Sequence, residues 1–459
     1  MEHVMLEEKD AGDWSYRGEG AANLVLAYTG SSPAFVGKVI RVPKVPKSGE
    51  GHANGHSVLS KNERLLWEGA DSITTAPTKE IAGQLFIQHV MIPLLGSDCI
   101  DTGVRVVVSR EFLENVEKNV HCQRPSWRAD AAKINTSIGS VLLIPDHSVF
   151  PSGTNSGEPC ISVEIKPKCG FLPLSRFISE ENAVKKNVTR FKMHQILKLH
   201  QRQLSQLSEY DPLDLFSGSR DRVHKAIKAL FATPQNNLRV FLNGSLVYGG
   251  LGGGMNGTSF VSGGAFEDHI RGFIKAADGS RTMIFQHLVA EIVYKLDVLD
   301  RLLRVQKLDS VDIEGAIHAY YNIVSQPCAV CKRFDEDKQR LKCSSVHSIP
   351  LEESVKIVRN YLIAATAKDC SLMISFRPRQ DGDPESAYSS VYLESTNQSF
   401  EYKAYFIDLD LKPLKKMEYY YELDQEIVNC YTQMVNPHSP CKEPQGPSVI
   451  QPCSLNPTA

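Results

Sequence analysis

The segment Cys160-Ile-Ser-Val-Glu-Ile-Lys-Pro-Lys168 alternates apolar and polar residues, which predicts a β-strand with two lysines at its end. In an extended strand Glu164, Lys166 and Lys168 point to the same side of the sheet. Three charges on one face of an apolar strand are costly to bury unless they meet an anion or one another. The segment therefore predicts either an anion-binding strand end or a strand end that emerges into water.

Upstream of this strand, the sequence predicts an antiparallel sheet with a glycine-rich turn. Residues 16–23 (YRGEGAAN) form the turn, and strand-like runs at 24–28 and 34–42 flank a Gly-Ser-Ser-Pro hairpin turn. Glycines let a turn approach phosphates closely, and Lys38 on the second run can neutralise them. The G-x-G motif alone is a weak signal and favours an ordinary hairpin turn, and the sequence contains no Walker-type G-x-x-x-x-G-K-[ST] motif.

Two more strands, at 104–109 and 140–144, precede the break Pro145-Asp-His-Ser148, which we expect to join two lobes. In the second half of the chain, the positions of the apolar residues predict helices at 181–207, 284–305 and 351–367.

The first of these helices carries a row of basic side chains. Arg190, His194 and Lys198 lie at positions i, i+4 and i+8 and therefore share one face. This face is either a binding surface or an ordinary solvated one.

Two aspartates are predicted to meet at one edge of a second sheet. Asp369 immediately precedes a strand-like run at 371–376, and Asp408 ends another at 402–408. If these strands pair antiparallel, both carboxylates reach the same edge, where phosphotransfer sites place a base beside a magnesium ligand. The alternative is that both are turn residues at strand ends. The polar residues that follow the second strand are Lys412, Lys415, Lys416 and Tyr420.

A separate group has the ligand types of a tetrahedral structural zinc site. His318 precedes the C-x2-C pair Cys328 and Cys331, and His347 follows it. A C-x2-C pair alone also fits chance or redox chemistry, and Cys343 is a rival fourth ligand. The histidine spacing is not that of a nucleic-acid-binding finger. A catalytic zinc is not expected, because protein ligands would fill all four positions.

Composition narrows the class of protein. The 459 residues allow about three domains or lobes, and 42% hydrophobic and 23% charged residues are ordinary for a globular chain. The 51 Lys+Arg balance 53 Asp+Glu, so the chain lacks the positive charge of a generic nucleic-acid binder. We expect neither a membrane span nor a signal peptide. The expected location is intracellular, cytoplasmic or nuclear or both, with the 11 cysteines as reduced thiols or metal ligands.

Two segments are expected to lie outside the folded core. Residues 249–264 contain eight glycines, which predicts a flexible surface excursion. Residues 436–459 carry six prolines, which predicts a disordered tail.

Longer motifs across residues 3–425 resemble the inositol-pentakisphosphate 2-kinase family in its plant form. EIKPKCGF and TAKDCS are specific in combination. The full set of motifs is YRGEGAANLVL, FVGKVIRV, RPSWR, ISVEIKPKCGFLP, RFKMHQ, EYDPLDLFSGS, PQNNLRVFLNG, LIAATAKDCS and FIDLDLKPLKKM.

The resemblance implies an α+β, two-lobed kinase-like fold, remotely related to protein kinases and inositol polyphosphate kinases. The implied N-terminal lobe is 1–144, the hinge 145–148 and the C-terminal lobe 149–435, with a structural zinc site in the latter and a tail at 436–459. The implied reaction transfers the γ-phosphate of ATP to the 2-hydroxyl of inositol 1,3,4,5,6-pentakisphosphate and gives the hexakisphosphate, phytate. The implied partners are these two substrates and magnesium, with no nucleic acid, no membrane and a monomeric chain.

The family motifs also imply roles for individual residues. Asp369 would accept the hydroxyl proton, and Asp408 would hold magnesium. The nucleotide would contact Gly18, Glu19, Gly20, Asn23 and Lys38, with Arg41 and Arg239 on its phosphates and Asp146 and His147 as the adenine hinge. The inositol phosphates would be held by Arg128, Lys166, Lys168, His194, Lys198, Asn236, Lys412, Lys416 and Tyr420. The family's zinc site would match His318, Cys328, Cys331 and His347.

Two positions depart from the plant pattern. Lys416 stands where the family leads us to expect arginine, so a bidentate phosphate contact becomes a point-charge one. The loop after Arg41 carries Lys44 and Lys47 among prolines, so an expected substrate-binding basic residue there has no clear match.

Charge supports the resemblance independently. A pentakisphosphate carries roughly ten negative charges, and the sequence places cations at several strand and helix ends, as such a ligand requires. Two alternatives remain from the sequence: a non-catalytic inositol-polyphosphate-binding module with a structural zinc, and a related kinase acting on lower inositol phosphates. The aspartate pair argues against the first, since a binding module needs neither a base nor a magnesium ligand.

Overall fold

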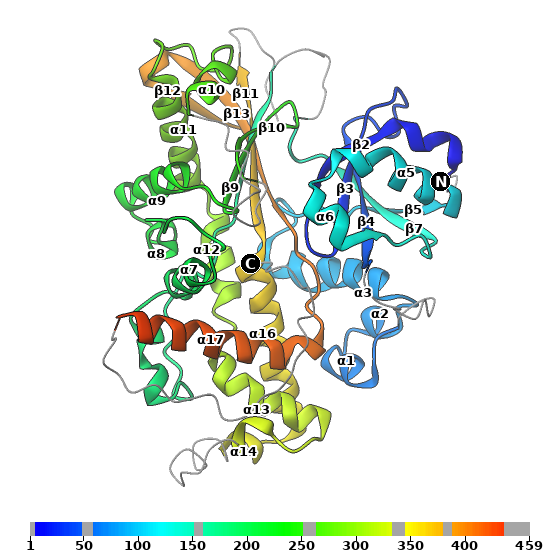
Figure 1. The fold of residues 1–459 in the computed structure, drawn as a ribbon, viewed down its shortest axis with the longest axis vertical. Coiled ribbons are helices and arrows are strands. Elements are labelled where there is room, and N and C mark those ends of the chain that lie inside the picture. Colours follow the sequence, from blue (N-terminus) through cyan, green and yellow to red (C-terminus); the bar gives the residue numbers. More distant parts are fainter. Residues whose placement is uncertain are drawn as a thin grey trace.

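The computed structural model describes residues 5–47, 58–150, 159–250, 263–332, 345–379 and 388–435 (Figure 1). Most of the glycine-rich segment (251–262) and all of the predicted tail lie outside the described residues, and so does Cys343. The described chain is mixed α+β, with two sheets and many helices, as expected for a kinase-like fold.

The first sheet has seven strands in the order β1-β5-β7-β4-β3-β2, with β6 beside β4. The predicted hairpin is confirmed, because β3 pairs antiparallel with β4. Strand β2 also pairs with β3 and includes residues 16–19 of the predicted glycine-rich turn. Helix α5 (Arg110–Val120) buries its apolar face in the core of this sheet. The strands are β1 (Met5–Leu6), β2 (Trp14–Glu19), β3 (Asn23–Tyr28), β4 (Lys38–Pro46), β5 (Val104–Val108), β6 (Ala132–Ile134) and β7 (Ser140–Pro145).

The second sheet has six strands in the order β10-β9-β8-β11-β13-β12, all antiparallel. Every β8 residue is buried. The strands are β8 (Ile161–Ile165), β9 (Leu238–Leu242), β10 (Ser245–Gly249), β11 (Ser371–Arg379), β12 (Ser389–Leu393) and β13 (Gln398–Ile407).

Helices flank the second sheet and extend below it in the view of Figure 1. They include α7 (Arg190–His200), α8 (Pro212–Leu215), α9 (Arg220–Ala232), α10 (Gly263–His269), α11 (Arg281–Lys295), α12 (Val298–Gln306), α13 (Asp312–Val324), α14 (Ala329–Lys332), α16 (Leu351–Asp369) and α17 (Met417–Val435), with short helices η4 (Glu180–Lys186) and η6 (Leu414–Lys416).

Three predicted elements differ from the structure. The strand 160–168 ends at Ile165, because Pro167 has no N–H to donate to a ladder. The helix 181–207 divides into η4 and α7, and the Thr189 side chain caps the start of α7. The helix 284–305 breaks at Leu296, whose backbone is extended. Helix α11 packs against α9, whereas α12 packs against α16 and against the short helix at Ile92–Leu95.

A helical segment between β4 and β5 joins the larger core. Helices α1 (Lys61–Leu66), α2 (Asp71–Thr74), α3 (Lys79–Phe86) and α4 (Ile92–Leu95) place their buried residues in the apolar cluster that also contains β8 and α16. Arg301 of α12 anchors the end of α4 by donating to the Leu95 carbonyl at 2.7 Å. Part of the predicted N-terminal lobe therefore packs with the second sheet.

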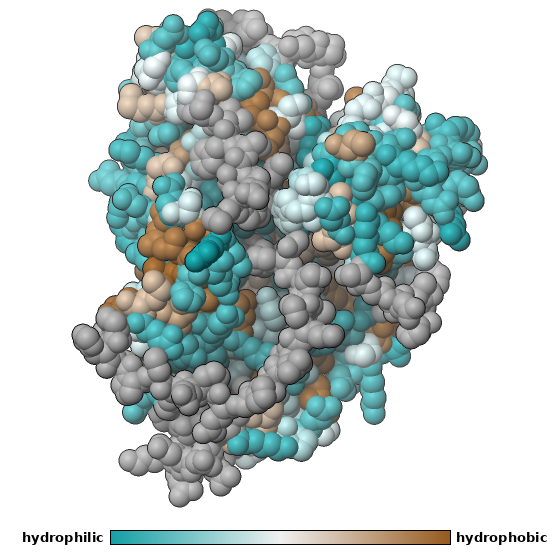
Figure 2. Space-filling model, in the orientation of Figure 1, coloured by the Kyte–Doolittle hydropathy of each residue, from teal (hydrophilic) through white to brown (hydrophobic). Residues whose placement is uncertain are grey.

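None of the described helices is both long and apolar enough to cross a membrane. On the face drawn in Figure 2, hydrophilic residues cover most of the described surface, and hydrophobic residues reach it in smaller areas.

Candidate active site

Two carboxylates meet where the central strands of the second sheet end. Asp369 closes α16 and leads into β11, and Asp408 directly follows β13. The predicted antiparallel pairing is confirmed, because Ser371 lies opposite Ile407. The side chains of Asp369 and Asp408 are 45% and 40% exposed, so both carboxylates can reach a ligand.

Lysines surround the first of these carboxylates. Lys412 Nζ donates to Asp369 Oδ2 at 2.7 Å, and Lys168 Nζ lies 3.9 Å from Oδ1. Burial alone would raise the pKa of Asp369, but Lys412, Lys168 and Lys166 together hold that pKa well below its usual range. Asp369 is therefore a carboxylate at neutral pH, and its counterions are residues predicted to bind the substrate.

The basic side chains that are predicted to bind the substrate have lowered pKa values, because they are buried close to other positive charges. Burial lowers the pKa of Lys168 to about 7 despite the neighbouring Asp369 carboxylate. Burial and Arg190 lower the pKa of Lys198 to about 8. Burial, Arg190 and Lys198 lower the pKa of His194 to about 2. On the predicted basic face of α7, His194 and Lys198 are therefore partly buried near the lysines that follow β8, whereas Arg190 is exposed to solvent.

The loop that holds Lys168 has an unfavourable backbone conformation. Lys168 has φ = 61°, in the left-handed region, which costs a non-glycine residue about 1–3 kcal/mol unless its surroundings hold it. Tyr210 holds the preceding residue by donating its hydroxyl to the Pro167 carbonyl at 2.8 Å. In this loop conformation the Lys168 ammonium lies 3.9 Å from the Asp369 carboxylate.

The second carboxylate faces cations from both sheets. Asp408 Oδ1 lies 3.6 Å from Arg41 Nη2, and Oδ2 lies 3.9 Å from Lys166 Nζ. Arg41 hydrogen-bonds Asp410 instead, with Nη2 at 3.1 and 3.0 Å from the two oxygens, and Asn23 Nδ2 approaches the same carboxylate at 3.5 Å. Asp408 thus keeps its oxygens beyond hydrogen-bond distance of both cations, in a position suited to an oxygen-binding divalent ion.

The glycine-rich turn has open space beside Gly18 and Gly20. Nothing in the described chain lies within 4 Å of a Cβ placed on Gly18 or Gly20. Glu19, between them, is buried and pairs with Lys44 and with Arg124, whose Nε lies 3.0 Å from Glu19 Oε1. The Glu19 carboxylate is thus occupied inside the first sheet, so this residue can meet a ligand only through its backbone.

The predicted hinge joins the two sheets through side chains. Asp146 accepts from Arg17 Nη2 at 2.8 Å, and Arg17 also donates to the Gly244 carbonyl in the turn after β9. His147 stacks on Tyr405 of β13 with ring centroids 4.1 Å apart, and burial, with Lys403 nearby, lowers the pKa of His147 to about 3. The hinge side chains are therefore held by protein contacts.

Two predicted arginines are near enough for the charge of one to act on the other. Arg239 of β9 is held by Glu164 at 3.2 Å, and Glu164 also accepts from the Ser371 hydroxyl at 2.9 Å. Arg128, on helix α6 (Ser126–Ala131), stacks over the Trp127 ring at 4.2 Å. Burial lowers the pKa of Arg128, and the charge of Arg239 lowers it further.

Four predicted site residues lie at the margins of this cluster. Lys38 begins β4 opposite Pro145, beside the hinge, and Asn236 lies in the turn that precedes β9. Lys416 ends η6, and burial with nearby Lys412 lowers its pKa. Tyr420 lies in the first turn of α17.

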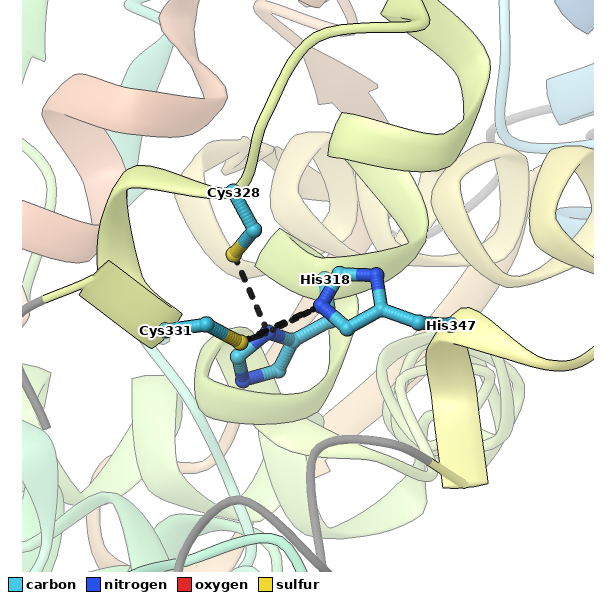
Figure 3. Close-up of side chains that lie close together, drawn as sticks. All are labelled: His318, Cys328, Cys331 and His347. Carbon is cyan, nitrogen blue, oxygen red and sulfur yellow. Dashed lines mark hydrogen bonds between the residues drawn. The ribbon is translucent and has the colours of Figure 1, made fainter. Parts of the chain in front are cut away.

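The predicted zinc ligands converge (Figure 3). His318 Nδ1 lies 3.3 Å from Cys328 Sγ, 3.5 Å from Cys331 Sγ and 3.2 Å from His347 Nε2, and Cys331 Sγ lies 3.3 Å from His347 Nε2. Zinc–sulfur and zinc–nitrogen bonds of about 2.3 and 2.0–2.1 Å give tetrahedral ligand separations of about 3.3–3.6 Å. The donor set and its spacing therefore fit zinc.

A second contact orients one ligand of this cluster. His347 Nδ1 contacts Asn322 Oδ1 at 2.9 Å, and Asn322 donates to the Val346 carbonyl at 2.9 Å. Such a contact sets which ring nitrogen of a histidine faces a metal.

Among the residues that the structure describes, two other groups of potential metal ligands are already paired with a protein cation. The ammonium of Lys185 lies among Asp312, Glu314 and Asp424 at 2.5–3.1 Å. The third group, made by two histidines and one glutamate, includes Glu291, which is paired with Arg220 at 2.7 Å.

Comparison with known proteins identifies the family. The family model described as inositol-pentakisphosphate 2-kinase matches residues 16–426. The chain belongs to the inositol-pentakisphosphate 2-kinase family. An Arabidopsis thaliana inositol-pentakisphosphate 2-kinase is 57% identical over 433 residues, covering 94% of this chain and 95% of the relative. A rice enzyme of the same name is 53% identical, covering 94% and 96%, and a zebrafish one is 30% identical, covering 96% and 98%.

The sequence did not predict several contacts within this candidate site, although it singled out Glu164 as a charged residue on the same strand face as Lys166 and Lys168. Asp410 pairs with Arg41, Arg17 joins the hinge to Gly244, and Glu164 holds Arg239. The Asp-Leu-Asp pattern at 408–410 was the available signal for Asp410. The other two contacts join positions far apart in the chain, and nothing in the local sequence points to them.

Proposed function

We propose that the protein transfers the γ-phosphate of ATP to the 2-hydroxyl of inositol 1,3,4,5,6-pentakisphosphate, with Asp369 as the base and Asp408 as the magnesium ligand. Membership of the family and 53–57% identity to the two plant enzymes support this reaction. The alternative, a non-catalytic binding module, is not favoured. The observation that carries the proposal is the juxtaposition of the two carboxylates at one sheet edge among cations.

The electrostatics suit a polyanionic substrate. Burial lowers the pKa of Lys168, and the charges of Lys166, Lys198 and Lys412 lower it further. Lys412, Lys168 and Lys166 hold the pKa of Asp369 below its usual range. A pentakisphosphate of roughly ten negative charges would satisfy these cations at once. We assign Lys166, Lys168, His194, Lys198, Lys412, Lys416, Tyr420, Asn236 and Arg128 to the inositol phosphates.

The nucleotide is assigned to the region between the two sheets. Asn23 and Arg41 from the first sheet and Arg239 from the second would hold its phosphates, and the backbone of residues 146–147 would meet the adenine. The open space above Gly18 and Gly20 supports a close approach of the turn to the phosphates. Magnesium at Asp408 would neutralise charge on the transferred phosphoryl group.

The chain's own residues would perform the remaining steps. Lys168 and Lys412 hold substrate phosphates, which orients the free hydroxyl toward Asp369. Asp369 accepts the hydroxyl proton as the oxygen attacks phosphorus. Arg41 exchanges Asp410 for the nucleotide phosphates, so its charge-assisted contacts move from protein to ligand.

We also propose that His318, Cys328, Cys331 and His347 hold a structural zinc. The ligand separations of 3.2–3.5 Å and the support of His347 by Asn322 carry this proposal. The four ligands join α13 to α14 and to the segment that precedes α16. Zinc there would hold these segments together and would take no part in phosphotransfer.

The test is a kinase assay with ATP, magnesium and inositol pentakisphosphate, with the product resolved by anion exchange. In this isomer only the 2-hydroxyl is free, so a hexakisphosphate product also fixes the position. Asp369→Asn is expected to lower kcat about 10²- to 10⁴-fold while the KM for ATP changes little. Asp278→Asn, an exposed aspartate paired with Arg281, is the control and should match wild type. A folded wild type that binds the pentakisphosphate but forms no hexakisphosphate would overturn the proposal.

A further inference from the structure

The last residue of α12, Gln306, is fully buried and joins backbone groups from two other segments. Its Nε2 donates to the carbonyls of Lys168 at 2.8 Å and Ala367 at 3.2 Å. Its Oε1 accepts from the Gly170 N–H at 2.8 Å. Only the amide nitrogen can donate to two carbonyls, so these three groups fix the orientation of the amide. Gln306 therefore ties the loop after β8 to the last turn of α16.

A second contact joins the same segments. Asp309, three residues after Gln306, accepts from Lys368 Nζ at 2.7 Å. Lys368 immediately precedes Asp369, and its ammonium also lies 5.1 Å from the centre of the Phe171 ring, in the loop after β8. Burial lowers the pKa of Lys368, but Asp309 and other nearby groups more than offset this and raise it, so the ammonium keeps its charge.

We propose that Gln306, assisted by Asp309, sets the position of Lys168 relative to Asp369 and is thus a positioning residue for phosphotransfer. We call these two residues the α12 brace. The inference rests on the roles proposed above for Lys168 and Asp369.

The geometry at Lys168 explains why a brace is needed. Its left-handed backbone conformation persists only where the surroundings hold it, and Gln306 bonds the carbonyl of that same residue. Lys168 Nζ lies 3.9 Å from Asp369 Oδ1, so one substrate phosphate and the reacting hydroxyl must bind within a few ångströms of each other. Catalytic geometry tolerates shifts of only about 0.5 Å. Without the amide, the loop would be held to α16 only by the contacts of Lys368 and by the pairing of β8 with β11.

Two substitutions remove the brace in different ways. Gln306→Leu keeps a similar volume and deletes all three hydrogen bonds. Gln306→Glu retains an acceptor for the Gly170 N–H but turns a carboxylate oxygen toward the two carbonyls. Both leave Lys168 and Asp369 in the chain, so a kinetic effect would report position and not the loss of a reacting group.

Gln398 offers a matched control. It is also buried, accepts from the Lys275 N–H at 2.8 Å and donates to the Phe273 carbonyl at 3.2 Å. It begins β13, at the end of that strand away from Asp408. Gln398→Leu therefore removes the same kind of buried backbone contact far from the site.

The measurements are the midpoint of thermal unfolding, steady-state kcat and KM for each substrate, and the calorimetric Kd for inositol pentakisphosphate. We expect all three variants to unfold at lower temperature. Only the Gln306 variants should lower kcat, about ten- to hundredfold, and weaken pentakisphosphate binding, while the KM for ATP stays within about twofold.

Gln306→Leu with wild-type kcat and pentakisphosphate KM, alongside a stability loss like that of Gln398→Leu, would overturn the inference. An equal rise in both KM values would do the same, since it would indicate general loosening. If Gln306→Leu does not fold, Gln306→Glu and the shorter Gln306→Asn are judged by the same criteria. A wild type that forms no hexakisphosphate refutes the proposed function and the brace with it, whereas an active wild type with unaffected Gln306 variants refutes the brace alone.

Discussion

Binding of the pentakisphosphate should depend on pH through two lysines. Lys168 has a pKa of about 7 and Lys198 one of about 8 in the free protein, because both are buried among other cations. A bound polyanion stabilises the charged form of each, so binding takes up protons above pH 7. The free protein loses these protons as pH rises, and affinity is expected to fall.

The magnitude follows from linkage. If both lysines are fully protonated in the complex, raising the pH from 7.0 to 8.5 weakens binding about 16-fold through Lys168 and about fourfold through Lys198. The product is about 60-fold in Kd, or about 2.4 kcal/mol. Uptake at pH 8.5 should approach about 1.7 protons per ligand bound.

Isothermal titration calorimetry at constant ionic strength, in buffers of different ionisation enthalpy, measures both quantities. Lys168→Arg is the decisive comparison, because arginine does not titrate in this range and should leave only the roughly fourfold change due to Lys198. Phosphate titration of the ligand is common to both proteins and cancels in the comparison. Equal pH slopes for wild type and Lys168→Arg would refute the reasoning.

Three further predictions concern other parts of the molecule. His318→Ala should lower the thermal unfolding midpoint and the zinc content measured by mass spectrometry without a selective loss of kcat; zinc-free wild type would contradict the site. Arg17→Ala, which separates Asp146 from Gly244, should raise the KM for ATP about three- to tenfold in steady-state kinetics while the pentakisphosphate Kd changes less than about twofold; an unchanged ATP KM would count against this link. Lys416→Arg should tighten pentakisphosphate binding about two- to tenfold by calorimetry, since a guanidinium binds phosphate in bidentate fashion; unchanged or weaker binding would exclude a phosphate contact there.

The sequence predicted the aspartate pair because its placement depends on local features. Each aspartate adjoins a strongly apolar strand. When those strands pair antiparallel, the start of β11 lies beside the end of β13, with Ser371 opposite Ile407, so the two aspartates reach the same edge of the sheet. The zinc group was predictable for the same kind of reason, since its residue types are rare and chemically specific.

Other features depend on contacts that no local pattern contains. The predicted helix 284–305 breaks at Leu296 because α11 and α12 pack against different partners, although the apolar spacing continues through the break. The segment 59–100 joins the larger core through buried residues whose destination the sequence does not specify. The contacts of Gln306 are also absent from any local pattern. In the sequence it is an ordinary glutamine at a helix end, but it bonds two segments that lie more than 60 residues before and after it.

The depressed pKa of Asp369 in the free protein is compatible with its proposed role as the base. Its principal counterions, Lys412 and Lys168, are also the proposed ligands of the inositol phosphates. Without substrate, Asp369 is the anion that partly neutralises this cluster, and its pKa falls accordingly. Bound phosphates would neutralise the lysines in place of Asp369 and would add negative charge close to it. Both effects raise the pKa of a carboxylate. Proton affinity would therefore rise only once the hydroxyl to be deprotonated is in place, which limits unproductive protonation of the empty site.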